Sequence, residues 1–274
     1  MGLFGKLFEK KECAICGGEI GLLGNRKLED GNMCKACAAK LSPWFDERRH
    51  STVAQIEEQL EYRESNKENV AAFRTTLSLG ETTKVLVDED AGRFMVTSAR
   101  NYSEANPDVL ELSDITGCTY DIDEGIDEVT RFDKNNEAVS YDPPRFTHSY
   151  NFYVTVYVNN PYFDDMRFKV NSRTIEVEER RGPAVSANPG GINLVIGSLS
   201  GAETFNPEAN VEYRTYRALC ERIVATLLEN RQSAREEIAA AAAPKAAVTC
   251  PYCGATTTPT TTNCCEFCDG ALGD

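Results

Sequence analysis

The spacing of apolar residues changes near residue 75 to a period of two, which is typical of half-buried antiparallel strands. The segment "TKVLVDEDAGRFMVT" predicts a hairpin, with Val85 and Val87 on one arm and Phe94 and Val96 on the other. "VLELSDITGCTYDI" predicts a strand pair or a bent strand, and "DMRFKVN" and "TIEVEE" predict two more strands. The most regular run is "YNFYVTVYVN", whose apolar face comprises Tyr150, Phe152, Val154, Val156 and Val158.

A helical pattern precedes these strands in "HSTVAQIEEQLEYRESNKENVAAF". Thr52 can cap this helix, and Gln55 three residues later completes a capping box. Val53, Ile56 and Leu60 form one apolar stripe. Beyond residue 62 the stripe gives way to charged residues, so we expect the second half of the helix to be a solvated connector.

A second helical pattern follows a loop rich in glycine, proline and serine, "RRGPAVSANPGGINLVIGSLSG". Asn206 can cap this helix, and Pro207 suits its first turn. Its apolar stripe has i, i+3, i+4, i+7 spacing and comprises Tyr216, Leu219, Cys220, Ile223, Val224, Leu227 and Leu228. Several antiparallel strands followed by one such helix predict a sheet or open barrel that the helix closes. The alanine-rich residues 233–248 then predict a tether.

The net charge of −14 is concentrated in the strand-rich region, whereas residues 1–74 are balanced. Because nucleic-acid binders neutralise phosphates with basic side chains, the acidic middle disfavours that function for the whole chain. No apolar run reaches the roughly 20 residues of a transmembrane helix, and no signal peptide is evident. Residues 1–11, "MGLFGKLFEKK", have the pattern of a short membrane-surface helix, although packing on the next domain or disorder is the preferred interpretation.

Eight of the 11 cysteines form C-x2-C pairs, which in a reducing compartment indicates metal ligation. The first set has the spacing C-x2-C-x17-C-x2-C and comprises Cys13, Cys16, Cys34 and Cys37. Gly17 and Gly18 follow the first pair and permit a tight turn. The intervening "EIGLLGNRKLEDGNM" predicts a hairpin with Asp30–Gly31 at its turn, and "CKACAAKL" predicts a short helix. This order predicts a treble-clef or zinc-ribbon module.

The second set ends the chain in "CPYCGATTTPTTTNCCEFC" and comprises Cys250, Cys253, Cys265 and Cys268. Cys264 is an alternative to Cys265, although Cys265 alone keeps the C-x2-C spacing. Four thiolates leave no open position for water or substrate, so we expect two structural zinc ions rather than catalytic metals. Rubredoxin-like iron uses similar spacing and remains an alternative. Cys220 is expected to be a buried, inert thiol.

The first 74 residues resemble the N-terminal zinc-binding domain of a group of uncharacterised bacterial proteins. The matching stretch is "CAICGGEIGLLGNRKLEDGNMCKACAAKLSPWFDERRHSTVAQIEEQL". That group has no assigned activity, so the resemblance implies a zinc site at the first four cysteines and no reaction. In its order of elements the middle of the chain is similar to a bacterial pleckstrin-homology-like domain. Such domains bind lipids, peptides or proteins and are seldom enzymes, an inference that rests on analogy of fold.

The predicted fold class is α+β: an N-terminal treble-clef or zinc-ribbon module, an antiparallel pleckstrin-homology-like domain closed by a helix, and a C-terminal zinc ribbon. The predicted domains are residues 1–49 (zinc module), 50–74 (connector helix), 75–232 (pleckstrin-homology-like domain), 233–248 (linker) and 249–274 (zinc ribbon).

The leading functional hypothesis is a cytoplasmic, non-enzymatic adaptor or scaffold that binds protein or lipid partners. One alternative is a nucleic-acid-binding or regulatory protein acting through a zinc ribbon; another is a peripheral membrane protein using residues 1–11. An enzyme is not expected, because the sequence has two histidines and no Walker A loop, dinucleotide fingerprint or nucleophile motif. The acidic run "DIDEGIDE" does not match a calcium loop, since Gly125 replaces a required ligand, and it predicts a solvated acidic loop.

Overall fold

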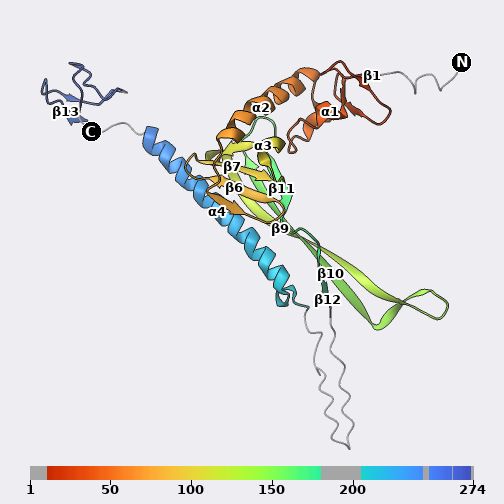
Figure 1. Ribbon diagram of the computed structural model, residues 1–274. Coiled ribbons are helices and arrows are strands. Elements are labelled where there is room, and N and C mark those ends of the chain that lie inside the picture. Colours follow the sequence, from red (N-terminus) through yellow and green to blue (C-terminus); the bar gives the residue numbers. More distant parts are fainter. Residues whose placement is uncertain (1–10, 180–204, 243–246, 261, 273–274) are drawn as a thin grey trace, which may run out of the picture. The chain divides into compact units, whose positions relative to one another are not determined.

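The computed structural model describes residues 11–179, 205–242, 247–260 and 262–272 (Figure 1). The chain divides into two compact units, Met1–Arg231 and Gln232–Asp274. Both contain antiparallel β-structure, and the whole is a mixed α+β protein. The predicted amphipathic segment at the N-terminus and the predicted loop before the last long helix lie, apart from Lys11, outside the described residues.

The first zinc module is built from short strands and one short helix. Its elements are β1 (Lys11–Glu12), β2 (Glu19–Ile20), β3 (Asn25–Lys27), β4 (Asn32–Cys34), α1 (Lys35–Ala38) and the 3₁₀ turn η2 (Glu47–His50). β3 pairs with β4 around Asp30–Gly31, which confirms the predicted hairpin. The small core contains Ile20, Leu28, Met33, Leu41 and Ile56. Trp44 is half-buried and lies outside this core.

Helix α2 (Val53–Ala72) begins with the predicted capping box between Thr52 and Gln55. Its first half buries Ile56 in the zinc module. The expectation of a solvated second half is wrong, because Arg63, Asn66 and Val70 are all buried. Val70 packs with residues of the next sheet, so α2 contributes to two cores.

The next sheet is an antiparallel meander in the order β5-β6-β7-β8. Its strands are β5 (Leu77–Leu79), β6 (Lys84–Asp88), β7 (Arg93–Thr97) and β8 (Val109–Glu111), with helix α3 (Tyr102–Ala105) before β8. The pairs Val85↔Val96 and Val87↔Phe94 confirm the predicted hairpin. All four side chains are buried.

A second sheet is dominated by two long strands, β9 (Ile115–Phe132) and β10 (Ala138–Val158). β11 (Asp165–Lys169) and β12 (Ile175–Glu178) pair with two successive stretches of β10, on the edge opposite β9. The 3₁₀ turn η3 (Leu112–Asp114) separates β8 from β9. In Figure 1 the β9–β10 hairpin extends well beyond the remaining strands of its sheet. The predicted apolar face of β10, from Tyr150 to Val158, is buried. The acidic run lies on β9 and not in a loop, because the backbone of residues 121–128 pairs with β10.

Helix α4 (Val211–Ala242) packs against the buried face of β10. Tyr213 meets Tyr150 and Phe152 edge-on, with ring centroids 4.9 and 5.2 Å apart. Its other buried side chains are Cys220, Ile223 and Leu227, which agrees with the predicted stripe.

The start and end of α4 differ from the prediction. Asn206 caps the preceding 3₁₀ turn η4 (Pro207–Ala209), whereas Asn210 accepts a hydrogen bond from the Tyr213 N–H at the start of α4. The alanine-rich segment predicted as a tether is helical up to Ala242. Uninterrupted alanine favours this extension, because alanine has the highest helix propensity.

The C-terminal module contains β13 (Val248–Thr249) and β14 (Thr256–Thr257), which form a two-stranded antiparallel pair. Its small core consists of Cys250, Cys265 and Leu272. No helix of the described residues has the length and apolarity required to cross a membrane.

Candidate metal centres

The first four-cysteine cluster combines a turn with a helix start. The N–H of Cys13 donates to the Gly18 carbonyl at 2.9 Å, and the Gly17 N–H donates to the Cys13 carbonyl at 2.8 Å. Gly17 has a φ of 69°, so the glycine after the first pair serves its predicted purpose. On the other side Cys34 is the N-cap of α1, and its sulfur accepts from the Cys37 N–H. The four cysteines thus come from one tight turn and one helix start.

The second cluster uses the same turn twice. The N–H groups of Cys250 and Cys265 donate to carbonyls five residues later, those of Ala255 and Gly270. The residue after each pair has positive φ: Gly254 at 73° and Asp269 at 55°. The second cluster is thus built from two such turns. The second turn therefore depends on an aspartate in the left-handed region and not on Gly270.

The sulfur positions of both clusters fit a tetrahedral ion. In each cluster the four sulfurs lie within 4.8 Å of one another. The Cys16–Cys34 sulfurs are 3.8 Å apart, and in the second cluster the closest pairs measure 3.6 and 3.7 Å. Zinc–sulfur bonds of about 2.3 Å place tetrahedral sulfurs about 3.8 Å apart. The eight predicted ligand residues thus form two sets suited to zinc, and neither set leaves a free coordination position.

Backbone N–H groups favour the thiolate at Cys13, whereas its surroundings disfavour the thiolate at Cys37. Burial raises the pKa of Cys13, but hydrogen bonds from Cys34, Cys16 and Ile15 outweigh burial and bring the pKa to about 6. For Cys37, burial and the neighbouring thiols raise the pKa to about 12. Four thiols this close cannot all ionise without a cation, so zinc binding must release protons.

The remaining three cysteines lie outside both clusters. The Cys264 sulfur points to the Thr262 carbonyl at 3.5 Å, while its backbone forms a bridge with Ala271. Cys118 and Cys220 are buried, and burial raises the pKa of each thiol to about 12. Such thiols are poor nucleophiles.

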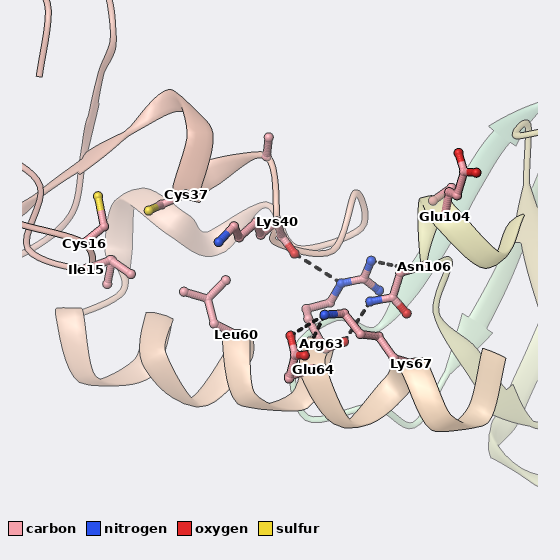
Figure 2. A pocket seen from close by; sticks show the side chains of 12 residues that line it. Ile15, Cys16, Cys37, Lys40, Leu60, Arg63, Glu64, Lys67, Glu104 and Asn106 are labelled. Atoms are coloured by element: carbon pink, nitrogen blue, oxygen red, sulfur yellow. Dashed lines mark hydrogen bonds and ion pairs between the residues drawn. The ribbon is translucent and has the colours of Figure 1, made fainter. Parts of the chain in front are cut away.

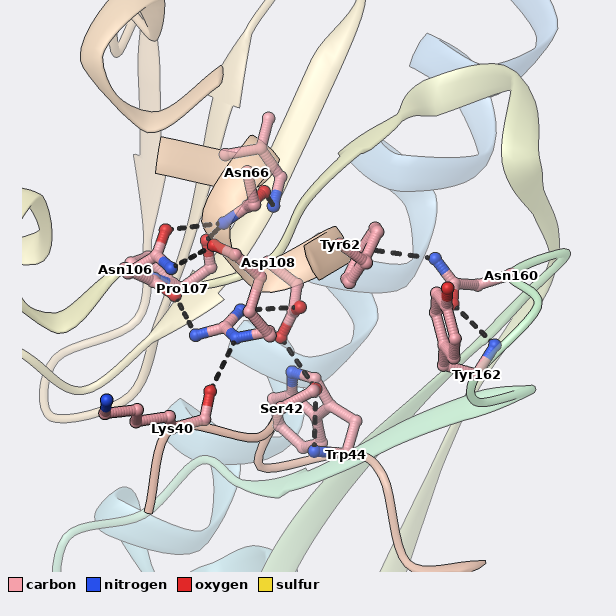
Figure 3. Close-up of polar contacts among 12 residues, drawn as sticks. Lys40, Ser42, Trp44, Tyr62, Asn66, Asn106, Pro107, Asp108, Asn160 and Tyr162 are labelled. Atoms are coloured by element: carbon pink, nitrogen blue, oxygen red, sulfur yellow. Dashed lines mark hydrogen bonds and ion pairs between the residues drawn. The ribbon is translucent and has the colours of Figure 1, made fainter. Parts of the chain in front are cut away.

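The contact between the first zinc module and the meander sheet depends on polar residues that the sequence pattern did not reveal. Arg63 donates to the Asp108 carboxylate at 2.7 Å. It also donates to the carbonyls of Lys40 and Asn106 (Figure 2). Asp108 also accepts from the Ser42 hydroxyl at 2.8 Å (Figure 3). Burial raises the pKa of Asp108, whereas the charge of Arg63 and the hydrogen bond from Ser42 act in the opposite direction. This network fixes α2 against both neighbours.

Replacing Arg63 by Met is expected to lower the free energy of unfolding by about 3–5 kcal/mol, because Asp108 would remain buried without its cation. Lys67→Met is the matched control one turn along α2: its exposed pair with Glu64 contributes less than about 1 kcal/mol. Urea unfolding of the full chain, followed by Trp44 fluorescence, measures both. Equal effects of the two substitutions would contradict a structural role for the buried pair.

A pocket of about 470 Å³ lies beside the first cluster, between α1, α2 and α3 (Figure 2). Its lining includes Cys16, Cys37, Lys40, Arg63 and Lys67. Arg63 and Lys67 are already paired with carboxylates. Lys40 and Glu104, which also line the pocket, take part in no ion pair of the described residues.

A second polar group missed by the sequence lies on β9 and β10. The carboxylate of Glu124 is 2.8 Å from His148 Nδ1 and accepts from the Tyr150 hydroxyl at 2.8 Å. These hydrogen bonds lower the pKa of Glu124, and the one with His148 has the larger effect. His148 also stacks on Phe205, with centroids 3.8 Å apart. The ring is enclosed, so this group is suited to stabilising the sheet.

No curated protein and no solved structure matches the chain. One family matches part of it, and the family's description is "Domain of unknown function (DUF4428)". The match covers residues 11–59, which include the first cluster and the start of α2. This agrees with the predicted N-terminal zinc-binding domain of unknown function. Residues 11–59 are therefore a DUF4428 domain, followed by strands and a second four-cysteine cluster that the family does not cover.

Proposed function

We propose that the protein is a non-enzymatic adaptor or scaffold with two structural zinc ions. All four sulfurs of each cluster converge on one point, so neither metal would have a position for substrate. Thiolate ligands require reduced cysteines, which supports a cytoplasmic location.

The middle of the chain supports a pleckstrin-homology-like domain. Its two antiparallel sheets, β5–β8 and β9–β12, precede α4, whose aromatic side chains pack on β10. This is the order of elements that the sequence predicts. Domains of this shape bind peptides, proteins or lipids, and the proposal extends that function to this chain by analogy of fold.

One observation carries the protein-binding role: the outer edge of β9 is open. β9 pairs with β10 along its length, and no second strand pairs with it among the described residues. The Thr116 carbonyl accepts from Arg231. From Gly117 to Phe132 the backbone groups of the outer edge are available to a further strand.

The side chains of β9 indicate what kind of strand would bind. Asp127 and Glu128 are exposed and take part in no ion pair of the described residues. Ile126 and Phe132 are 59% and 72% exposed. Pairing with β9 of a second copy would bring these carboxylates together, which is unfavourable. We therefore infer a partner with an extended segment that alternates basic and apolar residues.

The test is affinity purification of the full-length protein from its native cell, with quantification of captured proteins. The variant Asp127→Lys/Glu128→Lys is compared with Glu57→Lys/Glu61→Lys, which makes the same charge change on the exposed face of α2. A partner bound through β9 should fall about tenfold or more with the first variant and remain with the second. If no captured protein behaves in this way, the edge of β9 is not the binding element.

A further inference from the structure

The loop between β2 and β3 presents two leucines that the zinc module does not use. Leu22 and Leu23 are 84% and 90% exposed, more than any other large apolar side chain of the described residues. The Gly24 N–H donates to the Gly21 carbonyl at 2.9 Å, which closes a tight turn with the leucines at its tip. The flanking Ile20 is buried, so the turn is anchored while its tip projects.

Four basic residues lie next to this tip: Arg26, Lys27, Arg48 and Arg49. Arg26 donates to the Leu23 carbonyl at 3.4 Å, and Arg48 donates to the Lys27 carbonyl at 2.7 Å. Burial lowers the pKa of Arg48, and the charges of Arg49 and Arg26 lower it further. Within the described part of the chain no carboxylate forms an ion pair with any of the four. They therefore form a cationic cluster with unneutralised charge.

We propose that this surface, the Leu22–Leu23 tip with its cationic cluster, docks on an anionic lipid bilayer. The two leucines would insert among the acyl chains just below the headgroups, while the arginines and lysine bind lipid phosphates. A nucleic acid would satisfy the cations equally well, but its phosphate backbone offers nothing to two projecting leucines. The apolar tip thus favours a lipid surface.

Charge elsewhere in the protein makes this docking directional. The chain carries a net charge of −14, so most of its surface is repelled by an anionic bilayer. Glu29 and Glu47 border the cluster and limit its net charge. Two leucines are too little apolar area for stable anchoring alone, so binding requires tip and cluster together and is reversible.

Co-sedimentation of the full-length, zinc-loaded protein with vesicles tests this docking. Vesicles of phosphatidylcholine alone are compared with vesicles that also contain phosphatidylglycerol. We expect binding only to the anionic vesicles, weakened by salt. Leu22→Ser/Leu23→Ser and Lys27→Gln/Arg49→Gln should each reduce the bound fraction by about tenfold or more, with zinc content unchanged.

Matched controls remove the same chemistry elsewhere. Val211→Ser/Ile238→Ser removes two exposed apolar side chains from α4, and Arg100→Gln/Arg222→Gln removes two exposed cations. Both should bind like the wild type. Unchanged vesicle binding by the leucine variant would overturn the proposal, because another segment would then carry it. The protein could instead bind no vesicles but shift an oligonucleotide in a salt-sensitive way that depends on Lys27 and Arg49 and not on the leucines. That result would assign the cluster to nucleic acid.

Discussion

Replacing Cys265 by Ser is expected to reduce bound zinc from two ions per chain to one and to unfold the C-terminal module. The apolar part of that module's core is little more than Leu272 and the cysteines themselves. Metal binding therefore supplies its folding free energy, on the order of 10 kcal/mol. The adjacent Cys264 belongs to neither cluster, so Cys264→Ser should keep both ions.

Elemental analysis of purified protein gives the metal content, and it also separates zinc from iron. Hydrogen exchange of residues 247–272 reports whether the module has unfolded. Loss of metal from the Cys264 variant, or two ions retained by the Cys265 variant, would contradict the assigned ligands. In both variants the DUF4428 domain should keep its own ion, because its four ligands are separate.

Replacing Leu227 by Asp is expected to abolish cooperative unfolding of the domain that contains β5–β12 and α4. Leu227 is fully buried. The substitution removes apolar packing and buries a charge with no partner, which together cost more than about 5 kcal/mol. That is comparable with the whole stability of many domains.

Arg222→Asp provides the control on the exposed side of α4, where a change of less than about 1 kcal/mol is expected. Thermal unfolding of the full chain, followed by near-ultraviolet circular dichroism, compares the two variants. Equal melting temperatures would mean that α4 is not part of the core. The helix would then be an amphipathic element free to bind a partner.

The sequence predicted the elements whose signals are local. Examples are the two C-x2-C pairs of each module, the glycine after the first pair and the alternation along β10, each of which follows from chemistry within a few residues. The capping box of α2 is of the same kind, since Thr52 and Gln55 are three residues apart.

Elements that depend on distant partners could not be predicted in this way. In the sequence Arg63 and Asn66 look like part of a solvated helix face, because their buried partners lie 45 and 43 residues further along the chain. The acidic run suggests a loop until the backbone of β10 pairs with it. His148 and Glu124 become neighbours only once the register of the two strands is known.

The double role of α2 determines how this protein can be dissected. The DUF4428 match ends at residue 59, but α2 continues to Ala72. A fragment ending at residue 59 would keep Ile56 and lose more than half of the helix. The remaining fragment would keep Arg63 and Asp108 but lose Ser42 and Lys40, which hydrogen-bond to them. In any proteolytic or recombinant separation the first module should therefore be kept together with the sheet on which its helix ends.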